Sequence, residues 1–409
     1  MNKKEEKIIL FKAKRDCSGC SACMNICPVT AIKMEKDKYG FIYPKIDEKK
    51  CIRCGLCKKV CSYQNDELKY TNVSNYAAMS SDEEILKQSA SGGIFSTLAN
   101  NFIKDNGIVY GCSMEYENNV LTPRHIRIDN ENDIQKLQGS KYVNSIIDYI
   151  YQNVKNDLKN SKKVLFSGPP CQIAALNSYL NISRVNTKNL YTIDIICHGT
   201  PSTQFFQDYI RYYESKNNVK ITAYKFRDKT RNWGLKGTAI YKDTGNNIKQ
   251  KDIYGRLSTY YKMFLYGEIY RENCYSCKYA GKNRVGDITI GDYWGIEKVH
   301  PEYVIRNNGI FETKKGVSCI IVNSQNGEKL IKKYGENIML EKTYFDLVAK
   351  NNGQLNKPVV MPKSRSTILK IYENDGYAGV DKYIKKKQGL KRPLYYIYYK
   401  LNLKKFMKK

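Results

Sequence analysis

The chain has 409 residues, with 69 Lys or Arg against 40 Asp or Glu, and its formal net charge is +29. Its mean hydropathy is −0.58, no apolar run approaches the ~18 residues that span a bilayer, and the first residues lack a signal-peptide core. We therefore expect a cytoplasmic protein. Because cytoplasmic Cys stays reduced, its 14 Cys indicate metal or redox chemistry and exclude a disulfide framework.

Two cysteine runs near the N-terminus have the spacing of bacterial ferredoxins, in which each run gives three ligands to one 4Fe-4S cluster and its fourth to the other. Zinc is the alternative, but it takes its ligands as two pairs and fits this spacing poorly. The spacing predicts an α+β ferredoxin-like two-cluster domain over 12–66, with one cluster on Cys17, Cys20, Cys23 and Cys61 and the other on Cys51, Cys54, Cys57 and Cys27.

After a polar linker over 67–75, short β-rich segments alternate with helical patterns, which is typical of an α/β domain with a mixed sheet. We expect this domain over 76–350, and a basic C-terminal extension over 351–409. A helix after residue 200 is expected to have Thr200 as N-cap and Pro201 as its first residue. The expected strands are 108–114, 164–167, 191–197, 221–229, 238–251, 317–323 and 338–343, and the segment 238–251 is expected to contain a turn at 243–246.

Six cysteines lie outside the two runs. Cys112 and Cys319 sit in apolar strands and are expected to be core residues. The other four, Cys171, Cys197 and the pair Cys274 and Cys277, lie where strands end or in a CxxC. Strand ends of an open α/β sheet converge on one edge, so these four would suit a third 4Fe-4S cluster. The residues alone leave two alternatives open: a redox disulfide at the CxxC, and a Cys171 nucleophile with His198 as its base.

Two small-residue turns have backbone amides that a phosphate group would suit. Ser91, Gly92 and Gly93 precede an amphipathic helix, and Gly139 to Tyr142 read Gly-Ser-Lys-Tyr. Neither is a nucleotide-binding motif, and helix caps or plain turns remain the alternative. In the strand over 286–295, Asp287 and Asp292 either orient a bound ring or basic side chain or are turn residues, and Trp294 packs on a flavin or on the core.

Six blocks occur in the order found in one family: SASGGIF (89–95), LQGSKYV (137–143), FSGPPCQIAAL (166–176), DIICHGTPS (194–202), RENCYSCKYA (271–280) and GDITIGDYWG (286–295). With the cysteine runs in front, residues 12–345 resemble the coenzyme F420 hydrogenase/dehydrogenase beta-subunit family. Members of this family are flavoproteins that bind FAD and 4Fe-4S clusters. Some pass a hydride between flavin and a deazaflavin coenzyme, whereas a plant relative reduces a hydroxymethyl group on chlorophyll.

The resemblance implies a third cluster on Cys171, Cys197, Cys274 and Cys277. It also implies flavin contacts at Ser91, Gly92, Gly93, Gly139, Ser140, Lys141, Tyr142, Gly168, Pro169 and Pro170. Lys141 and His198 are the candidates for tuning flavin charge or moving protons. For His198, a structural hydrogen-bonding role is the alternative.

We therefore expect an iron–sulfur flavoprotein oxidoreductase that passes electrons between an FAD-linked hydride carrier, of deazaflavin type or unknown, and clusters or ferredoxin. The alternative is a non-catalytic electron-transfer subunit that docks to a catalytic partner. A composition rich in Lys, Asn, Ile and Tyr is typical of an anaerobe with an AT-rich genome, which need not make the deazaflavin.

The expected partner is a ferredoxin, a catalytic subunit or an acidic coenzyme. We expect no nucleic acid, because no nucleic-acid-binding signature is present. The tail over 393–409 spaces Leu394, Ile397 and Leu401 as a helix does, which favours either peripheral membrane contact or a solvated tail.

Overall fold

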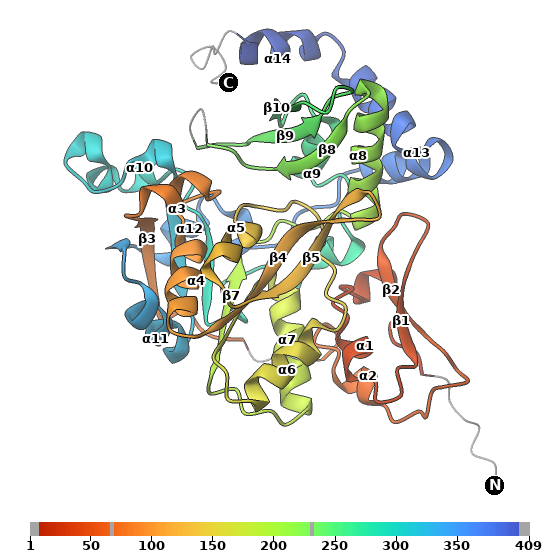
Figure 1. Ribbon diagram of the computed structural model, residues 1–409, viewed down its shortest axis with the longest axis vertical. Helices are drawn as coiled ribbons and strands as arrows, with labels where there is room; N and C mark the ends of the chain where they lie inside the picture. Colours follow the sequence, from red (N-terminus) through yellow and green to blue (C-terminus); the bar gives the residue numbers. More distant parts are fainter. Residues whose placement is uncertain (1–7, 66–68, 230–232, 401–409) are drawn as a thin grey trace.

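The computed structural model describes residues 8–65, 69–229 and 233–400. The N-terminal unit contains two short helices and a two-stranded antiparallel sheet in which Ile32 pairs with Ile46. These elements are α1 (Ala22–Ile26), β1 (Ile32–Lys36), β2 (Ile42–Ile46) and α2 (Leu56–Lys59). The unit packs through α1 against α6 and α7 of the larger domain (Figure 1). The expected α+β ferredoxin-like unit is confirmed.

The larger domain is built on an eight-stranded sheet of order β13-β3-β12-β11-β7-β6-β4-β5. Strands β11, β7, β6 and β4 run parallel, and the other neighbours pair antiparallel, so the expected mixed sheet is confirmed. The strands are β3 (Ser74–Ser80), β4 (Ile108–Glu117), β5 (Val120–Ile128), β6 (Val164–Gly168), β7 (Leu190–Ile195), β11 (Ile288–Asp292), β12 (Ser318–Val322) and β13 (Ile338–Lys342).

Helices cover both faces of this sheet, because successive residues of a strand point to opposite faces. Leu165 of β6 packs with α4 and α11, while Val164 and Phe166 pack with α6 and α7. The helices of this domain are α3 (Glu83–Gln88), α4 (Ile94–Lys104), α5 (Ile134–Leu137), α6 (Ile150–Lys159), α7 (Pro170–Ile182), α10 (Ile296–Val299), α11 (Gln325–Tyr334) and α12 (Phe345–Ala349).

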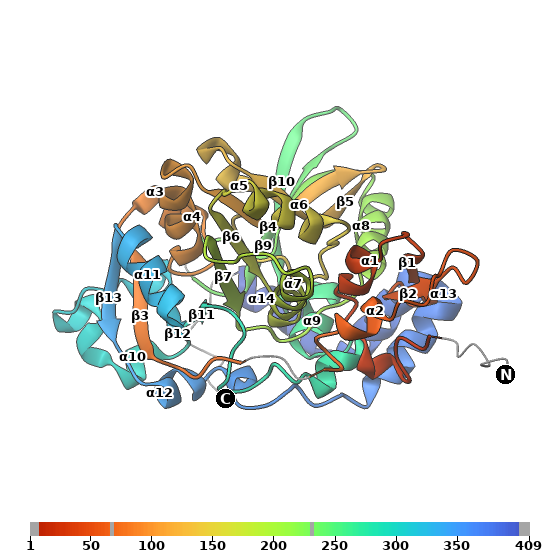
Figure 2. The same cartoon turned by 90° about the horizontal axis from the view of Figure 1, so that it is seen from below.

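A second, three-stranded sheet packs with α8, α9 and α13 around an aromatic core. Ile368, Tyr372 and Val380 of α13 belong to this core, so the described part of the C-terminal extension is packed against the domain. Figures 1 and 2 both place α13 on the same flank as the ferredoxin-like unit. The elements are α8 (Thr203–Asn217), β8 (Lys220–Lys225), β9 (Lys236–Lys242), β10 (Ile248–Tyr254), α9 (Thr259–Leu265), α13 (Ser364–Gln388) and α14 (Lys391–Lys400).

The start of α8 differs from the prediction. Its N-cap is Ser202, whose Oγ accepts a hydrogen bond from the amide of Phe205 at 3.1 Å. Thr200 and Pro201 precede the cap, because the Ser that follows Pro201 takes the extended conformation of an N-cap. Among the described residues, no helix combines the length and apolarity needed to cross a bilayer.

Candidate functional site

Three segments that are distant in sequence meet at the carboxyl edge of the central strands. Strand β7 leads into Cys197 and His198, β6 ends at Gly168 before Cys171, and β11 ends at Asp292. The three strands are parallel, so their carboxyl ends lie at one edge. Ligands of open α/β sheets bind at this edge. The fold therefore brings these predicted site residues together.

A first group of four cysteines, which we call the proximal site, consists of Cys17, Cys20, Cys23 and Cys61. Burial raises the pKa of Cys20 to about 12, and repulsion from Cys61 adds to this shift. Burial also raises the pKa values of Cys17 and Cys23, and repulsion from Cys61 adds to both shifts. Gln64 Nε2 donates a hydrogen bond to Cys61 Sγ at 3.4 Å. The fourth cysteine of the second run thus lies with three of the first.

A second group, the distal site, consists of Cys27, Cys51, Cys54 and Cys57. All four line one cavity, whose other walls are largely apolar. The amide of Ala31 donates a hydrogen bond to Cys27 Sγ at 3.2 Å, which is the kind of contact that sulfur ligands of clusters receive. Cys54 is exposed. The distal site therefore opens to the surface of the ferredoxin-like unit.

A third group, the core site, consists of Cys171, Cys197, Cys274 and Cys277. Burial raises the pKa of Cys197 to about 12, and repulsion from Cys274 and Cys277 adds to it. The same neighbours contribute to a pKa of Cys171 that burial raises well above its usual value. Four thiolates this close need positive charge beside them, which metal ions supply. The donor set fits a cluster.

The proximal site links the other two. Cys57 of the distal site contributes to the pKa of Cys23, and Cys20 contributes to that of Cys171 in the core site. The single hydroxyl proton of Tyr63 in the N-terminal unit is shared between the carbonyls of Asn273 at 3.1 Å and Ser276 at 3.0 Å. The N-terminal unit is thus fastened to the segment that carries Cys274 and Cys277.

Among the described residues, no group of three or more His, Cys, Asp and Glu side chains is arranged to hold a single metal ion. A 4Fe-4S cube makes a different demand, because each of its four thiolate ligands binds a different iron.

The Ser91 to Gly93 turn is pinned to the same edge of the sheet. Ser91 Oγ donates a hydrogen bond to the carbonyl of Val317 at 3.1 Å, and the Gly92 amide donates to Ser318 Oγ at 2.9 Å. Gly93 is the N-cap of α4 with a φ of 80°, a conformation that favours glycine. One amide of this turn is therefore already used within the protein.

The Gly139 to Tyr142 turn lies beside α5. Lys141 Nζ donates to the carbonyls of Leu137 at 3.0 Å and Gln138 at 2.8 Å, and so caps the helix. Burial lowers the pKa of Lys141 to about 8. Gly139 is exposed and Ser140 is half-buried, while the Tyr142 ring stacks on Phe264 with centroids 4.3 Å apart.

The turn after β6 is formed by Gly168, Pro169 and Pro170. Pro169 is the N-cap of α7, and Pro170 is its first residue. A Cβ on Gly168 would meet Gln172 Oε1 at 3.0 Å, so the turn passes close to that side chain. Pro170 is buried. This geometry sets the direction in which α7 leaves the sheet and carries Cys171.

A buried ion pair lies at the carboxyl edge, where Asp292 orients a basic side chain as one of its predicted alternatives had it; the partner, Arg227, was not predicted. Arg227 Nη1 is 2.9 Å from Asp292 Oδ2 and donates to Tyr142 Oη at 3.2 Å. Trp233 Nε1 donates to Asp292 Oδ1 at 3.0 Å, and its ring stacks on Trp294 with centroids 4.5 Å apart. We call these five residues the Arg227 cluster. Within the described residues, Arg227 Nε is buried without a hydrogen-bond partner.

Lys229 connects this cluster to the Ser91 turn. Its Nζ donates to the carbonyls of Leu86 at 2.8 Å and of Ser91, and burial lowers its pKa to about 7. Burial also lowers the pKa of His198, an effect that the charge of Asp292 opposes. Lys229 and Arg227 belong to no sequence motif with a defined spacing, so the sequence did not point to them as site residues. The only feature of their segment that could have done so is the nearby Trp233.

Asp287 lies at the opposite end of β11 from Asp292. Its Oδ2 accepts hydrogen bonds from the amide of Thr192 at 2.8 Å and from the hydroxyl of Thr192 at 2.7 Å. Ser324 Oγ donates to its Oδ1 at 2.6 Å. Asp287 is therefore a buried residue that ties β7 and α11 to β11, and Asp292 alone of the two belongs to the carboxyl edge.

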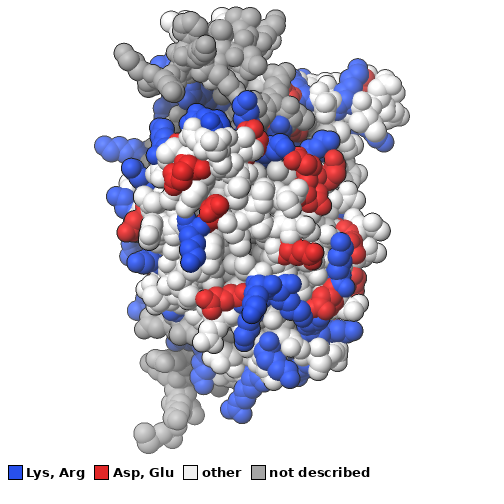
Figure 3. Space-filling model, turned by 90° about the vertical axis from the view of Figure 1, so that its left-hand side faces the viewer, with Lys and Arg blue, Asp and Glu red and all other residues white. Residues whose placement is uncertain are grey.

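The face over β13, β3 and α10 carries basic and acidic side chains intermingled with uncharged surface (Figure 3). The ferredoxin-like unit carries exposed lysines next to the distal site, at Lys49, Lys50, Lys58 and Lys59. On α14, Leu394 and Ile397 are exposed, and Leu401 lies outside the described residues.

Comparison with known proteins assigns most of the chain. Residues 75–148 and 161–346 match the N-terminal and C-terminal models of the coenzyme F420 hydrogenase/dehydrogenase beta subunit. Residues 16–65 match a 4Fe-4S dicluster domain.

An uncharacterized protein of Methanocaldococcus jannaschii is 24% identical over 370 residues, which are 80% of this chain and 90% of that protein. A chain of the F420-reducing [NiFe] hydrogenase complex from Methanosarcina barkeri is 17% identical with a TM-score of 0.44, over 74% of this chain and 92% of that one. From its matches to the family models, this iron–sulfur electron-transfer protein belongs to the coenzyme F420 hydrogenase/dehydrogenase beta-subunit family of oxidoreductases and carries an N-terminal domain for two 4Fe-4S clusters.

Proposed function

We propose that the chain passes electrons between a hydride carrier, which reacts at an FAD on the carboxyl edge, and a one-electron partner at the distal site. A flavin takes up a hydride as two electrons and releases them singly, and 4Fe-4S clusters accept one electron at a time. The residues of this chain hold the two kinds of cofactor side by side and supply the charge that each requires.

The observation that carries this proposal is the place of the core site. Cys197 is followed directly by His198, whose pKa is influenced by Asp292 of the Arg227 cluster. Cys171, another cysteine of the core site, has a pKa to which Cys20 of the proximal site contributes. We propose a third 4Fe-4S cluster on the core-site cysteines. Electrons would then pass from the edge of the sheet to the surface through neighbouring sites.

The Arg227 cluster suits the flavin. Arg227 Nε is buried without a partner among the described residues, so it can donate to an acceptor atom of a bound molecule. Lys229 is a second, half-buried basic side chain at the same edge, and the stacked rings of Trp233 and Trp294 offer aromatic surface. A flavin dinucleotide has acceptor atoms, phosphate charge and an aromatic ring system that match these three features.

The turns have supporting roles in this proposal. The residues at 91–93, 139–142 and 168–170 border the cofactor, and Tyr142 touches both Arg227 and the core. Lys141 acts as a positioning residue, because its ammonium group holds α5 against the 139–142 turn. His198 is the residue proposed to hold or move a proton, since it directly follows Cys197 in the chain and the charge of Asp292 acts on its pKa.

We propose an acidic redox protein, of ferredoxin type or a catalytic subunit, as the partner at the distal site. Cys54 is exposed, Ile52 near it is 60% exposed, and exposed lysines at 49, 50, 58 and 59 flank them in sequence. Complementary charge accelerates the encounter of such partners and makes its rate dependent on salt.

Cofactor content tests the enzyme proposal. Anaerobically purified protein should contain about twelve irons per chain, in three clusters of four, and one FAD. Cys197→Ser should lower the iron content by about four while the two N-terminal clusters remain. Absence of flavin after anaerobic reconstitution would refute the flavoenzyme, and an unchanged iron content in the variant would refute the core cluster.

A non-catalytic relay is the second candidate, favoured by the match to a beta subunit, which works beside other subunits. Bleaching of the flavin under anaerobic conditions discriminates the two. A deazaflavin, nicotinamides and reduced ferredoxin are offered in turn as donors. Bleaching by one of these with the chain alone supports the enzyme, whereas bleaching that requires an added partner subunit supports the relay.

A further inference from the structure

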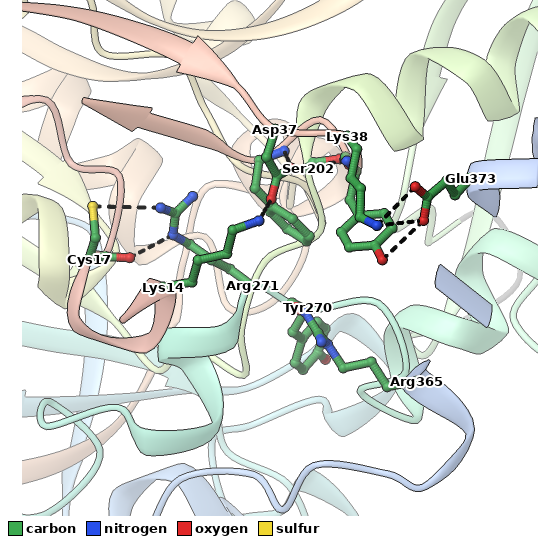
Figure 4. Close-up of polar contacts among 11 residues, drawn as sticks. Lys14, Cys17, Asp37, Lys38, Ser202, Tyr270, Arg271, Arg365 and Glu373 are labelled. Carbon is green, nitrogen blue, oxygen red and sulfur yellow. Dashed lines mark hydrogen bonds and ion pairs between the residues drawn. The ribbon is translucent and has the colours of Figure 1, made fainter. Parts of the chain in front are cut away.

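Arg271 spans the boundary between the ferredoxin-like unit and the larger domain. It precedes the core-site segment as the N-cap of η3 (Glu272–Ser276), but its side chain points to the proximal site (Figure 4). Its Nε donates to the carbonyl of Cys17 at 2.8 Å, and its Nη2 donates to Cys17 Sγ at 3.7 Å. The residue is 3% exposed. One buried cation thus touches a predicted cluster ligand.

The N-terminal unit is shaped to receive this guanidinium group. The ring centroid of Tyr43 lies 4.0 Å from Arg271 Cζ, a cation–π distance. A Cβ on residue 19 would lie 2.9 Å from Arg271 Nη1, so the guanidinium group packs directly against this backbone, and Gly19 has a φ of 68°, a conformation that favours glycine. Among the described residues, no carboxylate forms an ion pair with Arg271, which leaves the proximal thiolates as its counter-charge.

The C-terminal extension holds Arg271 in place. Arg365 of α13 donates from Nε and Nη2 to the carbonyl of Tyr270, at 3.0 and 2.9 Å. The same helix reaches the hairpin between β1 and β2, where Lys38 Nζ lies 2.7 Å from Glu373 Oε2. Ser202, the N-cap of α8, donates from Oγ to the carbonyl of Tyr39 at 2.8 Å. Both the arginine and the unit that it enters are therefore fastened.

We propose that Arg271 is a positioning residue that raises the reduction potential of the proximal cluster. An electron added at this site makes it more negative by one charge, and no bond is formed or broken. A buried cation stabilises added negative charge more strongly than an exposed one, because the local dielectric is low. Hydrogen bonds to ligand sulfurs raise cluster potentials in the same way. Arg271 supplies both effects to Cys17.

The inference rests on the two clusters of the N-terminal domain and requires neither the flavin nor the core cluster. If the flavin proposal fails, eight-iron protein can still be titrated, so the two failures are distinguishable. The consequence for electron flow is directional: a proximal site that is easier to reduce draws electrons away from the core site.

An anaerobic redox titration of the full-length protein, followed by electron paramagnetic resonance of the reduced clusters, tests the role of Arg271. The proximal signal is the one that Cys20→Ser removes. Arg271→Gln, which is neutral but can still donate to a carbonyl, should lower the potential of that signal. We expect about a tenfold change in the one-electron equilibrium constant, or about 59 mV. Arg271→Lys should recover most of this shift, because it retains the charge.

Arg53→Met is the matched control, since Arg53 is an exposed arginine that lines the distal site and should leave the proximal potential unchanged. Full iron content with an unchanged proximal potential in Arg271→Gln would overturn the proposal. An equal shift in Arg271→Lys would also overturn it, because charge would then not be the cause. If Arg271→Gln loses iron, Arg271→Met is measured instead, and loss of iron from both would overturn the proposal in favour of a role in cluster assembly.

Discussion

Replacing Asp194 by Asn should destabilise the larger domain strongly, because it leaves a buried arginine without its counter-charge. Arg284 Nη2 lies 2.7 Å from Asp194 Oδ1, and their side chains are 2% and 0% exposed. Arg284 also donates to the carbonyls of Tyr279 at 2.9 Å and Ile195 at 3.2 Å. The ion pair therefore joins the segments that follow Cys277 and precede Cys197.

The magnitude follows from this burial. Removing one partner of a buried ion pair costs about 3–5 kcal/mol, since the remaining charge is desolvated and unpaired. Asp194 Oδ2 also accepts from the amide of Gly286 at 3.0 Å, a contact that one oxygen of Asn can keep. With a urea slope of about 3 kcal/mol per M, the unfolding midpoint of Asp194→Asn should fall by about 1–2 M.

Urea unfolding of the full-length protein under anaerobic conditions, followed by far-ultraviolet circular dichroism, measures this shift. Asp129→Asn is the matched control, because Asp129 pairs with Arg127 at 2.7 Å while 58% exposed, and such pairs contribute under about 1 kcal/mol. The double variant Asp194→Leu with Arg284→Met should regain part of the loss, since no buried charge remains. A midpoint for Asp194→Asn equal to that of the control would refute the reasoning.

Three further results are expected. Cys112→Ser and Cys319→Ser should leave the iron content unchanged in an iron and sulfide assay, because neither residue belongs to the three four-cysteine sites. A loss of four irons in either variant would show that the mutated cysteine is a ligand of the core site. Ser202→Ala should lower the free energy of unfolding by at least about 1 kcal/mol, through loss of the N-cap of α8 and of the hydrogen bond to the carbonyl of Tyr39, and an unchanged urea midpoint would argue against both contacts. Burial lowers the pKa of Lys229 to about 7, whereas the unfolded chain keeps this proton up to about pH 10.4. The unfolded state therefore binds more protons between these values, and the contribution of Lys229 to the free energy of unfolding should rise with pH across that window. Lys229→Met should lose this rise between pH 7 and pH 9, and equal slopes for the two proteins would contradict it.

Short-range patterns of the sequence predicted much of the fold. The alternation of apolar strands and amphipathic helices indicated the mixed α/β sheet, and the hairpin of β9 and β10 turns at Asp243 to Asn246 as its residues indicate. Such patterns act over a few residues, where strand periodicity and turn chemistry are decided locally. The start of α8 was misplaced by two residues because Thr200 and Ser202 are both good caps, and only the packed chain selects one.

The cysteine spacing by itself indicated the two-cluster domain, because four cysteines at fixed intervals within eleven residues match the ligand spacing of a 4Fe-4S cluster. Only the tertiary structure brought Arg227 to Asp292, which are 65 residues apart, and Arg271 to Cys17, which are 254 apart. The sequence therefore determined which atoms can bind iron, and the packing of the larger domain and of α13 decided which charges surround them. The physical reason is that ligand spacing is a local property of the chain, whereas the electrostatic surroundings of a site depend on every segment that folds against it.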